Sequence, residues 1–330
     1  MSDDHNHRGD QAFRKQDLYG RWPEMTHGGA LSFLRRKYTD NLEGVDVAVS
    51  GVPFDNATTY RSGARLGPRA IREASVQLAE LKAFPFGFDP FDHLAVVDMG
   101  DCFIDIHRPD TIIESIREHI ARILWADALP LTFGGDHFIT YPILQAIAAK
   151  HGPVALIQFD AHTDTWPGPD DGAAPRFDHG SQILQAKTDG LIAVNRSLQI
   201  GVRTHNDNDH GFGVLTAPWV HDNGPHAVVH EILNRVGDAK AYLTFDIDCL
   251  DPAFAPGTGT PVPGGLSTAQ ALEIVRALGQ LNFVGADVAE VAPAYDVSEI
   301  TAIAAATIAH DFLCILAQRK RTQPPLNPQN

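Results

Sequence analysis

The sequence predicts an α/β protein with a mostly parallel central sheet that is covered by helices on both faces. Short apolar runs alternate along the chain with longer segments in which apolar residues recur at helical spacing. This alternation is typical of β–α units, whose parallel strands are buried on both faces. Polar residues follow several of the apolar runs directly, and ligands bind at the carboxyl ends of strands in such sheets.

The first half of the chain alternates regularly between these two patterns. A Gly-rich loop at 58–68 ends in Pro68, which favours a helix start, and Asp110 is a suitable N-cap for the Ile-rich segment that follows it. Gly134 and Gly135 separate a strand from the next helix. The expected strands are 45–52, 94–97, 129–133 and 154–157, and the expected helices are 69–81, 111–127 and 136–150. The acidic stretch 98–101 is interpreted as turn and capping chemistry.

The second half continues the alternation. Ser267 and Gln270 form the pattern of a capping box, which predicts a helix start. The Gly- and Pro-rich segments 165–178 and 252–265 are expected to be loops, and long loops in compact domains are often functional. The expected strands are 197–202, 213–217, an apolar run ending at 245, and 283–288, and the expected helices are 226–236, 267–278 and 299–317.

Composition limits the classes of function. The chain has 330 residues, 44% of them hydrophobic, and a formal net charge of −15. No basic stripe is visible, so we expect no nucleic-acid partner. Three widely spaced cysteines form no disulfide framework. We find no signal-peptide core and no apolar run near membrane-spanning length, and therefore expect a soluble, cytoplasmic protein without a membrane partner.

Acidic residues and histidines cluster after three apolar runs. Asp160, His162 and Asp164 alternate along an extended segment, so their side chains share one face. Two carboxylates and an imidazole on one face suit a divalent metal. The alternative is a polar strand exit with ordinary capping residues.

Two further clusters favour the metal. Asp246 and Asp248 share a face after a second apolar run, and His137 follows a third. Buried carboxylates are costly without a cation. Four Asp and two His are enough to hold two metal ions, and a carboxylate-rich set without thiolate favours Mn²⁺ over Zn²⁺.

Four motifs carry a resemblance to a known family: GGDH at 134–137, DAHTD at 160–164, FDHG at 177–180 and TFDIDCLDPAFAPGTGTP at 244–261. From about residue 47 to 317 the chain resembles the ureohydrolases, which include arginase and agmatinase, and is most similar to bacterial agmatinases. The resemblance implies an arginase-like three-layer α/β/α fold and a trimer or hexamer. It also implies two Mn²⁺ per subunit, held by His137, Asp160, His162, Asp164, Asp246 and Asp248.

The resemblance also implies the remaining site residues. Glu290 in DVAEVAP is expected to bind a guanidinium as a two-pronged ion pair, although a Glu at a strand end also pairs with local Arg or Lys. Asp164 is expected to take the proton of the attacking hydroxide. His179 is expected to pass it to the leaving amine, the alternative being a lone surface histidine. Thr260 is expected to orient Glu290.

The identity of the substrate depends on the loop 165–178. Agmatine, cleaved to putrescine and urea, fits the resemblance, and Trp166 after the DAHTD motif argues against arginine. Asp170 and Asp171 suit a distal ammonium. Arg176 suits instead the carboxylate of guanidinobutyrate or guanidinopropionate. Two other classes stay open: a catalytically silent regulatory homologue that binds metal, and a single-zinc deacetylase of the same architecture.

These expectations divide the chain into three parts. Residues 1–28 are expected to form a flexible N-terminal arm, residues 29–318 a single ureohydrolase catalytic domain, and residues 319–330 a flexible C-terminal tail.

Overall fold

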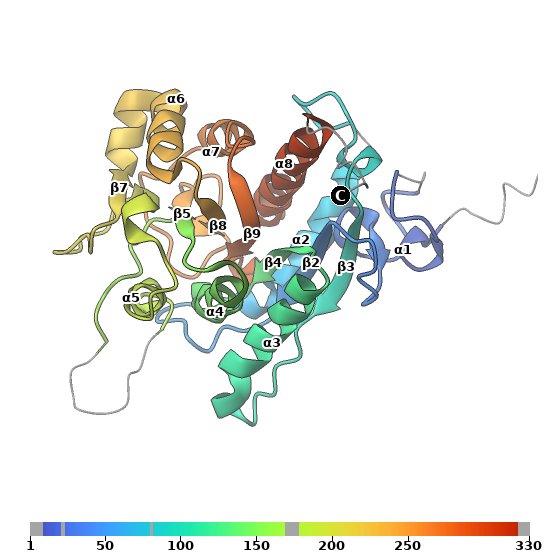
Figure 1. The fold of residues 1–330 in the computed structure, drawn as a ribbon, viewed down its shortest axis with the longest axis horizontal. Coiled ribbons are helices and arrows are strands. Elements are labelled where there is room, and N and C mark those ends of the chain that lie inside the picture. The colour runs from blue at the N-terminus through green and yellow to red at the C-terminus, as the bar shows by residue number, and fades with distance from the viewer. Residues whose placement is uncertain (1–8, 21–23, 80–81, 169–177, 323–330) are drawn as a thin grey trace, which may run out of the picture.

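The computed structural model describes residues 9–20, 24–79, 82–168 and 178–322. Within these residues the centre of the protein is a nine-stranded sheet in the order β1-β3-β2-β4-β9-β8-β5-β6-β7 (Figure 1). Every neighbouring pair is parallel, so the predicted α/β class is confirmed. The strands are β1 (Lys37–Tyr38), β2 (Val47–Val52), β3 (Val96–Asp101), β4 (Leu129–Gly134), β5 (Ala155–Phe159), β6 (Leu198–Val202), β7 (Gly213–Thr216), β8 (Lys240–Asp246) and β9 (Asn282–Ala289).

Helices cover both faces of the sheet and make three layers. In Figure 1, α3, α4 and α5 lie below the sheet, and α6, α7 and α8 lie above it. The buried apolar residues form two clusters, one on each side, and α2 joins the cluster of α6, α7 and α8. The helices are α1 (Gln11–Arg14), α2 (Gly67–Ser75), α3 (Ile112–Trp125), α4 (Thr140–His151), α5 (Gln182–Thr188), α6 (Ala217–Val236), α7 (Thr268–Arg276) and α8 (Ile300–Thr322).

The strands are buried on both faces because successive side chains enter opposite clusters. On β5, Ala155, Ile157 and Phe159 belong to the cluster beside α8, whereas Leu156 belongs to the cluster beside α4. This follows from the two-residue period of a strand. A strand buried on both faces needs apolar residues at nearly every position, which is why these segments read as continuous apolar runs.

Several element boundaries differ from those expected. Helix α6 consists of two helices joined across a kink at Gly224, whose φ of 77° and ψ of 168° are not helical. The second follows this kink, next to the expected start at 226, whereas the first, which begins at Ala217, was not expected. The short β1 and α5 were not expected, and α2 ends at Ser75, before a tighter turn at Val76–Leu78.

Part of the predicted N-terminal arm is packed against the domain. Gln11 and Ala12 of α1 are buried, and the Asp10 carboxylate accepts a hydrogen bond of 3.0 Å from the Ala30 backbone. The Lys15 ammonium donates to the carbonyls of Tyr19 and Gly20. Residues 1–8 and 323–330, at the two predicted flexible ends, lie outside the described residues, and α8 extends to 322.

A buried ion pair corrects the interpretation of the acidic stretch 98–101. Strand β3 continues to Asp101, and Asp98 is fully buried. The Arg72 guanidinium donates to both oxygens of Asp98, at 2.8 and 3.0 Å, and to Asp101 at 2.6 Å. The Phe33 backbone also donates to Asp98 at 2.8 Å. These acids therefore join α2 to the sheet and do not form a turn.

Helix α8 is long and apolar enough to cross a membrane by length and composition, although we expected no such run. Its most apolar window is 78% buried inside the protein, which is the pattern of a core helix. Ala302, Ala305, Phe312 and Leu313 belong to the main apolar cluster. The burial of this helix against α2, α7 and the sheet accounts for its composition.

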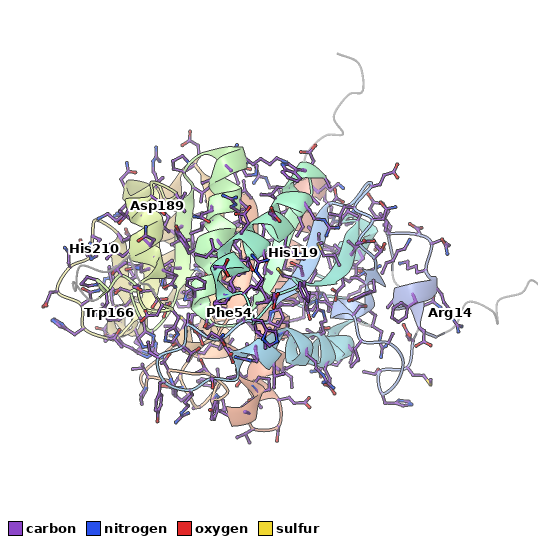
Figure 2. All side chains as sticks on the ribbon, turned by 90° about the horizontal axis from the view of Figure 1, so that it is seen from below. Arg14, Phe54, His119, Trp166, Asp189 and His210 are labelled. Carbon is purple, nitrogen blue, oxygen red and sulfur yellow. The ribbon has the colours of Figure 1, made fainter. Side chains whose placement is uncertain are left out.

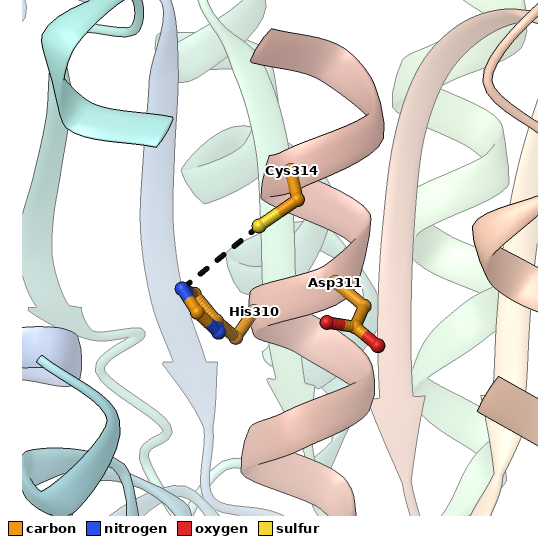
Figure 3. Close-up of side chains that lie close together, drawn as sticks. All are labelled: His310, Asp311 and Cys314. Carbon is orange, nitrogen blue, oxygen red and sulfur yellow. Dashed lines mark hydrogen bonds between the residues drawn. The ribbon is translucent and has the colours of Figure 1, made fainter. Parts of the chain in front are cut away.

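A second group of potential metal ligands lies on α8 but is used in packing (Figure 3). Cys314 is one helical turn from His310, and their Sγ and Nε2 atoms are 3.9 Å apart. The Asp311 carboxylate is already paired, because its Oδ2 accepts a 2.6 Å hydrogen bond from Arg276. Burial raises the pKa of the Cys314 thiol, which disfavours the thiolate that binds metals. The group therefore lacks the properties of a metal site.

The Arg72–Asp98 pair predicts a large effect on stability. Replacing Arg72 by Gln leaves the Asp98 charge buried without its partner, so we expect the free energy of unfolding to fall by about 3–5 kcal/mol. Urea denaturation measures the change. The matched control is Arg117→Gln, which removes an exposed pair with Glu114 and is expected to cost less than about 1 kcal/mol. Equal losses in the two variants would contradict the role of the buried pair.

The buried His310 predicts a loss of stability in acid. Burial, reinforced by Arg276, lowers the pKa of His310 to about 4, so between this value and about 6.5 the unfolded chain binds a proton that the folded chain does not. Stability is therefore present at neutral pH and is lost as the pH falls through that window, by on the order of 1–3 kcal/mol. Relative to His310→Gln, the wild-type protein should lose this stability between pH 7 and 4.5, whereas the exposed control His226→Gln should follow the wild type.

Candidate metal centre

The site is built at the carboxyl ends of four adjacent strands. β4, β9, β8 and β5 are neighbours in that order. His137 follows β4, Glu290 follows β9, Asp246 ends β8, and Asp160 follows β5. Segments that are distant in the chain therefore meet because parallel strands end at the same edge of the sheet.

Backbone geometry at the strand ends requires particular residues. A Cβ on Gly135 would lie 1.9 Å from the carbonyl oxygen of Phe54, so only glycine fits where β4 turns into the next helix. Asp164 and Glu290 both have left-handed backbone conformations, with φ of 53° and 66°. Non-glycine residues with such values are uncommon and are often found at functional sites.

The six predicted metal ligands lie together. The Nδ1 atom of His137 is 3.0 Å from Asp160 and 2.8 Å from Asp164, and 3.3 Å from Asp246. The Nδ1 atom of His162 is 3.4 Å from Asp160 and 3.1 Å from Asp248. Two groups could each hold a metal ion, and they share Asp160: His137, Asp160 and Asp164 form one, and Asp160, His162 and Asp248 the other.

The hydrogen bonds of His137 indicate that its Nδ1 atom is a ligand. The Thr244 hydroxyl donates to Asp287 at 2.6 Å, so it accepts from Nε2 of His137, which lies 2.7 Å away. In the neutral imidazole, the form that binds a metal, Nδ1 then carries a lone pair. This atom is fully buried, has no hydrogen-bond partner among the described residues, and faces three carboxylate oxygens. A lone pair and several carboxylates around one point fit a divalent cation, and the hydrogen bond from Nε2 to Thr244 fixes the ring as in known metal sites.

Neighbouring side chains donate hydrogen bonds to the carboxylates of the cluster. Gln158 donates to Asp160 at 2.8 Å, and Gln182 donates to Asp164 at 2.7 Å. Sequence analysis missed these glutamines, as it missed Thr244 and Asp287. A signal was present for Gln158, Thr244 and Asp287, because each is a polar residue inside an otherwise apolar strand. For Gln182 we find no such signal.

The crowded charges of the cluster favour binding of a cation. Burial disfavours the charged form of His162, but Asp248 and Asp160 outweigh it and raise its pKa to about 12. Burial and the neighbouring Asp160 raise the pKa of Asp164 to about 6. Crowded carboxylates that retain protons are the groups that release them when a cation binds.

Glu290 and His179 extend the cluster toward β9. Glu290 is fully buried, and its Oε1 atom accepts from the His137 backbone at 2.8 Å and lies 2.8 Å from His179 Nδ1. Its Oε2 atom has no hydrogen-bond partner among the described residues. Burial lowers the pKa of His179, but the Glu290 carboxylate outweighs burial and raises it to about 9. His179 is thus 7% exposed and paired, not a lone surface histidine.

A pocket of about 510 Å³ opens onto this cluster. Trp166 forms part of its wall, with its ring centroid 6.1 Å from that of His162. Figure 2 places Trp166 near the same end of the molecule as His210, far from Arg14. The lining residues are Thr59, His162, Asp164, Trp166, Pro167, Gly168, Asp178, His179, Gly180, Ser181, Asp246 and Thr260.

Three expectations about this pocket need comment. Thr260 lines it, but its hydroxyl donates to Asp248 at 3.3 Å and not to Glu290, which we expected it to orient. Glu290 is not among the described residues of the pocket wall, but its Oε1 atom contacts His179, which is. Asp170, Asp171 and Arg176, the candidate residues for the substrate tail, lie outside the described residues.

Known proteins share both the sequence and the fold. A model of the arginase family matches residues 45–314. An agmatinase from Chromobacterium violaceum is 61% identical over 313 residues, which are 94% of this chain and 96% of that protein. The crystal structure of a hypothetical agmatinase from Burkholderia thailandensis is 59% identical, with a TM-score of 0.92 over 96% of this chain and 99% of that one.

A more distant relative extends the comparison to another hydrolase. The structure of proclavaminate amidino hydrolase from Streptomyces clavuligerus is 36% identical, with a TM-score of 0.83 over 89% of this chain and 99% of that one. The matched residues include the ends of all four strands that carry the cluster. The chain belongs to the arginase family and is a hydrolase.

Proposed function

We propose that this protein is an agmatinase that hydrolyses agmatine to putrescine and urea with two Mn²⁺ per subunit. The observation that carries the proposal is the pair of His/Asp groups that share Asp160. Relatives named agmatinases, at 50% identity or more over most of the chain, support the substrate.

The donor set supports manganese. His137, Asp160 and Asp164, with Asp246 beside them, would hold one ion, and Asp160, His162 and Asp248 would hold the other. Four carboxylates, two imidazoles and no thiolate suit Mn²⁺ better than Zn²⁺. When bound, a pair of divalent ions supplies an activated water as the nucleophile near neutral pH.

The charge of the site favours a cationic substrate. Four aspartates contribute about −4 and two divalent ions about +4 by formal charge, so the centre carries no net positive charge. A guanidinium is permanently cationic at neutral pH. It approaches such a centre without the electrostatic repulsion that a positively charged site would impose.

Glu290 is our candidate for binding the guanidinium. Its Oε2 atom is buried and has no hydrogen-bond partner among the described residues, so an N–H donor would stabilise it. His179 pairs with Oε1 of Glu290, so Oε2 is the oxygen that is left for the guanidinium. Asp164 would take the proton of the attacking water, and His179 would return a proton to the leaving amine, because an amide anion does not leave unaided.

The pocket wall supports a substrate with a cationic tail. Trp166 gives it an apolar, aromatic surface, and Asp178 adds a carboxylate. No Lys or Arg is found among the lining residues, all of which come from the described part of the chain. Among these described residues an acidic tail such as that of guanidinobutyrate would find no cation, which makes such compounds the alternative.

The proposal also covers the wider context of the enzyme. We propose that residues 29–318 form one catalytic domain and that subunits assemble into a trimer or hexamer, as the family resemblance implies. The free and buried cysteines Cys102, Cys249 and Cys314 support a reducing, cytoplasmic location. An intact cluster supports an active enzyme over a silent regulatory homologue.

Urea release from a panel of substrates tests the function. After chelation and reloading with Mn²⁺, agmatine should be cleaved at least tenfold faster than 4-guanidinobutyrate, judged by kcat/KM, and arginine should be cleaved more slowly still. Chelation alone should lower the rate at least a hundredfold, because the nucleophile depends on the metal. Elemental analysis should find two Mn per chain.

Each alternative result would assign the protein a different function. Preference for 4-guanidinobutyrate would replace agmatine by an acidic-tailed substrate. Two bound metals without urea release from any of the three compounds would identify a regulatory homologue. One bound zinc would point to a deacetylase.

Replacement of Glu290 by Gln tests the binding of the guanidinium. The amide oxygen still accepts from the His137 backbone, but the charge that pairs with the guanidinium is lost, so kcat/KM for agmatine should fall by about a hundredfold or more. Glu299→Gln is the control, because Glu299 also has a left-handed backbone (φ 60°) but is exposed. Unchanged kcat/KM in Glu290→Gln, with bound metal retained, would assign Glu290 a structural role.

A further inference from the structure

Thr59 lies in the loop after β2, is exposed, and lines the pocket. Its backbone N–H donates to Nε2 of His179 at 2.9 Å, and its hydroxyl oxygen lies 2.7 Å from the same atom. His179 therefore has partners on both ring nitrogens, with Glu290 at Nδ1 and Thr59 at Nε2.

The two groups of Thr59 act differently on His179. A backbone N–H only donates, so it favours a ring whose Nε2 carries a lone pair. The hydroxyl donates or accepts, so it also accommodates an Nε2–H. On the other side of the ring, Glu290 favours a proton at Nδ1, both in the neutral ring and in the ring that is protonated at both nitrogens. The hydroxyl is thus the one Thr59 group that can accept the second proton of His179.

The loop that carries Thr59 is held by the site itself. Asp136, at the turn after β4, accepts from the Ala57 backbone at 2.8 Å. The His179 backbone donates to the Ala57 carbonyl at 3.3 Å. Thr59 is therefore positioned by the same turn that presents His137, and its contact with His179 is part of a fixed arrangement.

We propose that the Thr59 hydroxyl is the proton relay between His179 and the substrate pocket, an inference that rests on the proposed hydrolysis. Nε2 of His179 gives its proton to the Thr59 oxygen, and the Thr59 O–H proton passes to the leaving amine nitrogen. The C–N bond breaks with its electron pair on that nitrogen, and the hydroxyl is regenerated. His179 returns to the form with a lone pair at Nε2, which the Thr59 N–H stabilises.

The charged groups around His179 fit this role. Its proton is favoured by the carboxylates of Glu290, Asp164 and Asp136 and opposed by burial. The Thr59 N–H opposes protonation at Nε2. Because these groups act on the ring in opposite directions, the protonated and neutral forms of His179 lie closer in energy. A proton shuttle requires this, because it must both accept and release a proton.

Substitution of the hydroxyl alone tests the relay. Thr59→Val keeps the backbone N–H and the branched shape, and should lower kcat for agmatine by about ten- to a hundredfold with KM changed less than threefold. Thr59→Ser should restore kcat to within threefold of wild type. Thr188→Val, the same change at an exposed threonine on α5 that does not line the pocket, is the control and should stay within threefold.

Nitrogen-15 spectra of the histidine-labelled protein test whether His179 has the tautomer that the relay requires. His179→Asn assigns the signals. In wild type and Thr59→Val, Nδ1 of His179 should carry a proton, because Glu290 and the backbone N–H both remain. A ring protonated only at Nε2 would overturn the relay, whether or not the enzyme releases urea.

Two kinetic outcomes distinguish this inference from the function on which it rests. If wild type releases urea and Thr59→Val keeps kcat within threefold, the relay is refuted and the function stands. If wild type releases no urea from any guanidino substrate, both are refuted. A loss in Thr59→Val that appears in KM or in metal content would assign Thr59 to binding or folding.

Discussion

The structure depends on the convergence of four aspartates at one buried place. Asp160, Asp164, Asp246 and Asp248 lie together at the ends of β5 and β8 with only two imidazoles between them. Such charges repel one another strongly where water is excluded. Protons or cations must reduce this repulsion, and a metal ion displaces the protons, so binding of metal and the protonation of the site are linked. Most of the other features of the site keep these oxygens in position.

The surrounding hydrogen bonds connect the metal cluster to the machinery for moving protons. Asp287 orients Thr244, and Thr244 orients His137 with its Nδ1 lone pair toward the aspartates. The His137 backbone in turn donates to Glu290, which faces His179. One continuous network therefore runs from β8 and β9 to the pocket. His137 thus contributes a side chain to the metal cluster and a backbone N–H to the residue that faces the proposed proton carrier.

Much of the fold was predictable because its signals are local. Apolar runs buried on both faces predict parallel strands, and the capping box at Ser267 predicted the start of α7, where both of its hydrogen bonds are present. One error was to overlook the helix between Ala217 and the kink at Gly224. Another arose where packing overrides a local signal. Asp98 reads as a turn residue, but Arg72, from a helix earlier in the chain, holds it inside β3.

The sequence alone determined which side chains can bind metal, because alternation along a strand decides which residues share a face and which chemistry they offer. Tertiary structure alone decided how they are shared between two groups, which nitrogen of His137 faces the aspartates, and that Thr260 contacts Asp248. It also brought Thr59 to His179 from 120 residues away. Contacts between distant segments depend on strand order and loop path, which no local pattern of residues contains.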